Sequence, residues 1–94
     1  MCFAAVYKDG NVTRRDTEWG LADVGLSREG AIANMAMRAM RHVEWLGAIL
    51  LQEILEGKAD PEQPYLVNDE ETGIYLWYCI VREDREPPAF PDAD

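Results

Sequence analysis

Reactive and metal-ligating side chains are scarce in this 94-residue sequence. It holds one histidine, His42, and two cysteines, Cys2 and Cys79, whose number and spacing fit neither a zinc site nor a disulfide framework. His42 is the single imidazole available for proton transfer, and its place at the border of an apolar helical face favours a structural role. The acids of residues 69–71 lack the full alternation of a calcium loop. We therefore expect no cofactor, no metal and no enzymatic activity.

Long hydrophobic runs are also missing. No apolar run reaches the roughly 18 residues of a membrane span, and residues 1–8 lack the basic start and apolar centre of a signal peptide. The apolar fraction is 48%, and three Trp and four Tyr argue against general disorder. The length suits one hydrophobic core. We expect a single folded domain that is cytoplasmic, with no membrane partner.

Positive charge is in short supply, and the deficit is concentrated at the C-terminal end. The net charge is −9, and from residue 60 onward ten acids face only Arg82 and Arg85. A field of this sign repels nucleic acid and anionic membranes, and it speeds association with basic surfaces. Direct binding to nucleic acid is therefore not expected. As an alternative to a binding role, the negative charge can serve solubility alone.

The longest stretch with helical periodicity runs from Ser27 to Gly57. Ser27 suits an N-cap, and Gly57 suits the left-handed residue that closes a helix. Between them we expect one long amphipathic helix, with a bend or an early end near Gly47 as the alternative. Its apolar residues recur at intervals of three and four, so that they share one face: Ile32, Ala36, Ala39, Met40, Val43, Leu46, Gly47, Leu50 and Ile54.

Strand-forming residues precede this helix. Cys2–Tyr7 is an apolar run with Phe3, Val6 and Tyr7, and the Asp9-Gly10 dipeptide after it favours a tight turn. The turn predicts a return strand over Asn11–Trp19. The glycines and small residues of segment 20–26 then predict a loop that leads into the helix.

A second hairpin follows the helix and the Pro-containing linker 58–64. Strands are predicted over Tyr65–Asn68 and Ile74–Arg82, on either side of a five-residue turn that ends in Gly73. The order strand, strand, helix, strand, strand predicts an α+β domain over residues 1–82, with an antiparallel sheet packed on the helix. Alternate residues of the last strand are apolar on both faces, which favours a homodimer that covers the second face. Residues 83–94, with three prolines and five acids, predict a flexible acidic tail.

Two large apolar residues, Trp45 and Ile49, fall on the polar side of the predicted helix. Such residues are covered by another part of the chain or contact a partner, for which a Trp flanked by Arg38 and Arg41 is a suitable anchor. The three methionines at positions 35, 37 and 40 are interpreted as core residues.

A protein-binding function accounts best for these features. Compact acidic domains without catalytic residues include nuclease immunity proteins, antitoxins and phage-encoded inhibitors of host defence. These proteins present carboxylates to the basic grooves of their partners, which otherwise hold nucleic acid. We expect an inhibitor that engages a basic, nucleic-acid-handling protein such as a nuclease. Its predicted contact residues are Asp69, Glu70, Glu71, Glu83, Asp84, Glu86, Trp45 and Ile49.

Two other functions stay open. A structural or regulatory homodimer would use the two-sided strand and the face of Trp45 as subunit contacts. An N-terminal-Cys hydrolase is the weaker alternative: Cys2 resembles the nucleophile of certain glutamine amidotransferases, but Phe3 stands where their pattern has Gly. We interpret Cys2 as a small apolar residue of the first strand.

Overall fold

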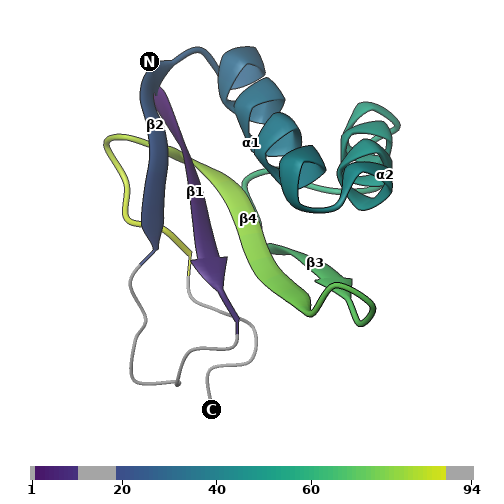
Figure 1. Cartoon of the computed structure of the whole chain (residues 1–94). Coiled ribbons are helices and arrows are strands. Elements are labelled where there is room, and N and C mark those ends of the chain that lie inside the picture. Colours follow the sequence, from purple (N-terminus) through teal and green to yellow (C-terminus); the bar gives the residue numbers. More distant parts are fainter. Residues whose placement is uncertain (1, 11–18, 89–94) are drawn as a thin grey trace.

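The computed structural model of the chain describes residues 2–10 and 19–88 and contains two layers (Figure 1). One layer is an antiparallel sheet and the other is a pair of helices, so the α+β class with a helical layer on an antiparallel sheet is confirmed. The elements, in chain order, are β1 (Phe3–Asp9), β2 (Gly20–Leu26), α1 (Arg28–His42), α2 (Glu44–Leu55), β3 (Tyr65–Asp69) and β4 (Ile74–Arg82).

The sheet joins two hairpins through β1 and β4. Its strand order is β2-β1-β4-β3, and all neighbours are antiparallel. Tyr7 of β1 and Tyr65 of β3 both lie opposite Tyr78 of β4. Residues opposite each other in a ladder point to the same face, so the three tyrosines form a row on one side of the sheet.

The prediction of one long helix is wrong, and so is the order that contained it. Val43 has an extended backbone (φ −141°, ψ 100°) and separates α1 from α2, so the order is strand, strand, helix, helix, strand, strand. The break lies four residues before Gly47, where a bend was the alternative. The Val43 side chain is buried in the core, and α2 folds back along α1.

The predicted helix ends are confirmed. Ser27 is the N-cap of α1, and its hydroxyl accepts a hydrogen bond from the Gly30 N–H at 3.0 Å. Gly57 follows the C-cap of α2 with φ +76°, a conformation that favours glycine. Local sequence signals thus fixed where the helical region begins and ends.

The first hairpin differs from its prediction. β1 extends from Phe3 to Asp9, so Cys2 precedes the strand and is exposed. The loop predicted for residues 20–26 is wrong, because this segment is β2 and pairs with β1. Of the strand predicted over residues 11–19, only Trp19 belongs to the described residues, and it lies outside a strand. The second hairpin is confirmed, with β3 one residue longer than expected.

Apolar side chains are buried on both faces of the sheet. The larger cluster contains Tyr78 and Ile80 of β4 and packs against Met35 and Ala39 of α1. A smaller cluster on the other face is formed by Ala4, Val6, Cys79 and Val81, with Trp19 packed against it. These four side chains are buried within one chain. The apolar second face of β4 therefore does not require another copy to cover it.

The segment after β4 contacts the residues that directly precede β1 and β2. The Glu83 N–H donates to the Cys2 carbonyl at 3.0 Å, and Trp19 Nε1 donates to the Pro88 carbonyl at 3.0 Å. Residues 89–94 lie outside the described part of the chain. The flexibility expected for 83–94 stays a prediction.

Candidate interaction surfaces

The turn between β3 and β4 presents three predicted contact acids. Asp69 organises the turn: its carboxylate accepts hydrogen bonds from the Glu71 N–H at 3.3 Å and the Thr72 hydroxyl at 2.9 Å. Glu70 and Glu71 are exposed on the turn, and Asp69 is half-buried. None of the three acids pairs with a Lys or Arg among the residues described by the structure. The turn is therefore a uniformly negative surface.

The other three predicted acids follow the opposite end of β4. Asp84 forms an ion pair with Arg82 at 3.2 Å, and the Glu83 carboxylate accepts a hydrogen bond from the Gly25 N–H at 3.3 Å. Glu86 is exposed. This surface also carries Arg82 and Arg85, and two of its carboxylates already have partners within the chain. Its negative charge is therefore weaker than that of the β3–β4 turn.

These two acidic groups do not form one site. They are separated by the nine residues of β4, which at about 3.3 Å per residue span roughly 30 Å. Figure 1 shows the β3–β4 turn at one end of β4 and the segment after Arg82 at the other. The structure thus divides the predicted carboxylate patch into two surfaces at opposite ends of β4.

Trp45 and Ile49 are exposed on α2, so the described part of the chain does not cover them. Their side chains are 60% and 38% exposed, and a spacing of four residues makes them neighbours on the helix. The predicted flanking by Arg38 and Arg41 rested on a continuous helix, and the break at Val43 removes that basis. Arg38 instead lies over the Tyr7 ring, 4.8 Å from its centroid.

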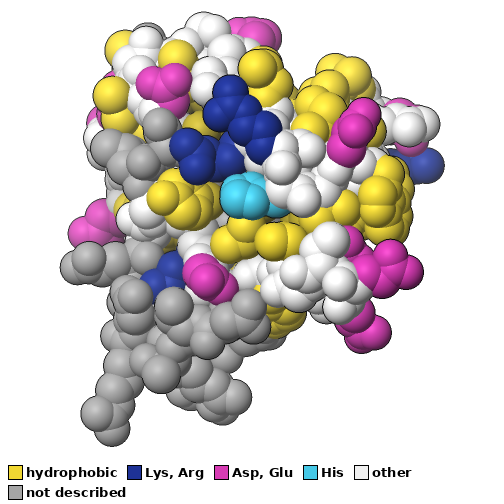
Figure 2. All heavy atoms as spheres, viewed as in Figure 1, with side chains coloured by type: hydrophobic (Ala, Val, Ile, Leu, Met, Phe, Trp, Pro, Cys, Tyr) yellow, Lys and Arg dark blue, Asp and Glu magenta, His cyan; other side chains and the backbone are white. Residues whose placement is uncertain are grey.

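A basic region occupies the C-terminal part of α1. Arg41 and His42 are exposed in the last turn, and Arg38 lies one turn earlier. None of these three forms an ion pair within the described part of the chain. Figure 2 shows basic side chains grouped beside the histidine, with hydrophobic side chains around them. Cations at a helix C-terminus interact favourably with the helix dipole, which accounts for their placement.

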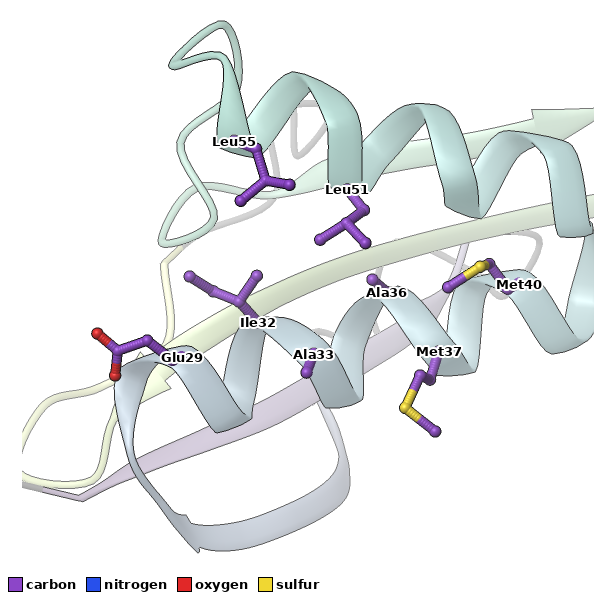
Figure 3. Close-up of a pocket in the computed structure, with 8 residues that line it drawn as sticks. All are labelled: Glu29, Ile32, Ala33, Ala36, Met37, Met40, Leu51 and Leu55. Atoms are coloured by element: carbon purple, nitrogen blue, oxygen red, sulfur yellow. The ribbon is translucent and has the colours of Figure 1, made fainter.

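A groove between α1 and α2 was not predicted. It has a volume of about 230 Å³, and Figure 3 shows Leu51 and Leu55 of α2 pointing toward α1. Met37, interpreted as a core residue, is 54% exposed beside the groove, and Leu55 is 77% exposed. The interpretation of Met35 as a core residue is confirmed. The lining residues are Glu29, Ile32, Ala33, Ala36, Met37, Met40, Leu51 and Leu55.

The two cysteines and the histidine come from different parts of the fold. Cys79 is fully buried, and burial raises the pKa of its thiol to about 12, which keeps it protonated at neutral pH. Cys2 lies before β1, whereas His42 ends α1, so the fold holds them on different elements. Among the described residues, no group of three His, Cys, Asp or Glu side chains is placed to hold a metal ion.

Comparison with family models, curated proteins and solved structures finds no match to this chain. Neither described helix has the length and apolar character needed to cross a membrane.

Proposed function

We propose that this chain is a small acidic protein-binding domain that engages a basic protein partner through its β3–β4 turn. The observation that carries the proposal is the presence of exposed carboxylates on this turn without a cationic partner in the described part of the chain. In the free protein these exposed carboxylates are hydrated and carry an uncompensated negative charge, which attracts the cations of a basic partner. They therefore favour association and raise its rate.

The acids of the turn have different roles in this proposal. Glu70 and Glu71 contact the partner, whereas Asp69 holds the turn through its two internal hydrogen bonds. Glu83, Asp84 and Glu86 lie at the other end of β4 and serve a second, weaker contact, for which a partner must extend across the sheet. A basic groove that otherwise holds nucleic acid supplies the required cations, and an inhibitor of such a protein is the function we favour.

Trp45 and Ile49 provide an apolar contact separate from the acidic turn. Large exposed apolar residues act as anchors when a partner excludes water from them. Because Trp45 lies on α2 and the acids lie on the sheet, the two surfaces need not bind together.

The proposal is tested by affinity capture from lysate of the source cells, followed by binding measurements with each purified captured protein. We expect the double substitution Glu70→Gln, Glu71→Gln to slow association about tenfold at low salt and to reduce its salt dependence. Glu83→Gln with Glu86→Gln, which removes the same charge from the other surface, is the matched control and should have a smaller effect. An affinity that changes neither with salt nor with the first pair of substitutions contradicts the proposal.

A further inference from the structure

The outer surface of α1 carries one row of exposed side chains spaced four residues apart. The row consists of Glu29, Ala33, Met37 and Arg41, and all four are exposed. Residues at this spacing are neighbours on a helix and form one of the ridges by which helices pack. Glu29 and Arg41, at the two ends, make no ion pair within the described part of the chain.

The order of the row is acid, small, large, base, which is complementary to itself when reversed. We propose that a second copy of this chain docks on this ridge, with the two α1 helices antiparallel. A two-fold axis midway along the ridge places Glu29 opposite Arg41 of the second copy, and Ala33 opposite Met37 of the second copy. Both pairings occur twice, as an isologous interface requires.

The groove between α1 and α2 receives the large residue of this pairing. Met37 of the second copy, next to Ala33, enters the groove where Ile32 and Leu55 line it. Figure 3 shows Glu29 at one end of this groove and Met37 beside the other. A methionine side chain is unbranched and adapts to an irregular apolar space. Docking therefore covers Leu55 and Met37, two of the most exposed apolar residues of the described chain.

The net charge of −9 opposes self-association in general, but the helical layer does not share it. Together the two helices contain three arginines and three glutamates, whereas the unpaired acids of the β3–β4 turn belong to the sheet. Two copies that meet through α1 thus bring neutral surfaces together. The charged residues concerned are Arg28, Arg38, Arg41, Glu29, Glu44 and Glu53.

Charge reversal at the two ends of the ridge tests this interface. Sedimentation equilibrium of the full chain should show a concentration-dependent monomer–dimer equilibrium. Glu29→Arg and Arg41→Glu should each raise the dissociation constant about tenfold or more, because each places like charges opposite one another twice. The double variant, and an equimolar mixture of the two single variants, should regain dimer because both restore opposite charges.

Matched controls separate the interface from general effects on folding. Gln52→Ala changes an exposed residue of α2 outside the ridge and should leave the dissociation constant unchanged, whereas Met37→Glu should abolish the dimer. Circular dichroism of each variant checks that it is folded. A wild-type chain that stays monomeric at high micromolar concentration overturns the proposal, as does a dimer that both single variants retain. The interface shares no residue with the acidic turn, so this result is independent of the proposed function.

Discussion

A β-carbon added at Gly47 would lie 2.7 Å from the Cα of Met40, closer than real β-carbons approach backbone atoms. It would also collide with the backbone nitrogen and the Cγ of Met40. Glycine at position 47 thus permits α2 to fold back against α1 just after the break at Val43. The close approach of the two helices depends on this one position.

Gly47→Ala should therefore destabilise the protein, although alanine is the better helix former. The helices must separate to admit the methyl group, and we expect a loss of about 1–3 kcal/mol in the free energy of unfolding. Urea unfolding followed by circular dichroism measures the change. Gln52→Ala, at an exposed position of the same helix, is the control and should change stability by less than about 0.5 kcal/mol. A gain in stability for Gly47→Ala would contradict the close packing.

The N-cap of α1 offers a second test of local stability. Ser27→Ala removes the acceptor for the Gly30 N–H and should lower the free energy of unfolding by about 1 kcal/mol. Ser27→Asp keeps an acceptor at the cap and should retain most of the stability. Equal losses for the two substitutions would show that the hydroxyl does not act as a cap.

The elements that local signals predicted are those bounded by turn and cap residues. Ser27 and Gly57 delimit the helical region, and Gly73, with φ +74°, closes the β3–β4 turn. The break at Val43 has no such signal at the residue itself: the nearest glycine is Gly47, four residues later, and the local sequence suits a helix. It is accompanied by the packing of Gly47 against Met40, which only the folded chain supplies.

The strand β2 and the groove escaped prediction for different reasons. β2 contains two glycines, which are poor strand formers, and pairing with β1 imposes its extended backbone. The groove, in contrast, could have been found. Met35 and Met37 are two positions apart on one helix and point in nearly opposite directions, so a buried Met35 implies an exposed Met37. The separation of the acids likewise follows from the length of β4.

Two buried groups predict that stability falls at alkaline pH. Burial raises the pKa of Cys79 from 9.0 to about 12 and that of Tyr78 from 10.0 to about 12. The unfolded chain loses these protons first, so the contribution of both groups is fully present below pH 9 and is lost between pH 9 and 12. Each group accounts for a loss on the order of 2–4 kcal/mol.

Urea unfolding at several pH values separates the two contributions. Cys79→Ala should flatten the decrease that begins near pH 9, because the thiol has the lower pKa of the two groups in the unfolded chain. Tyr78→Phe should reduce the decrease above pH 10, and a residual slope should remain because burial and Glu53 also raise the pKa of Tyr65. The change of stability with pH is the relevant quantity, since each substitution also alters packing. Unchanged slopes in both variants would contradict the burial of these groups.

The β3–β4 turn allows structural and binding roles of neighbouring carboxylates to be separated. Asp69→Ala removes the acceptor for the Glu71 N–H and the Thr72 hydroxyl, so it should destabilise the protein by about 1 kcal/mol. Glu70→Gln leaves both hydrogen bonds in place and should change stability by less than about 0.5 kcal/mol. Thermal unfolding of the two variants at neutral pH measures the difference. If Glu70→Gln destabilised the chain as much as Asp69→Ala, the Glu70 carboxylate would be part of the turn structure and not available to a partner.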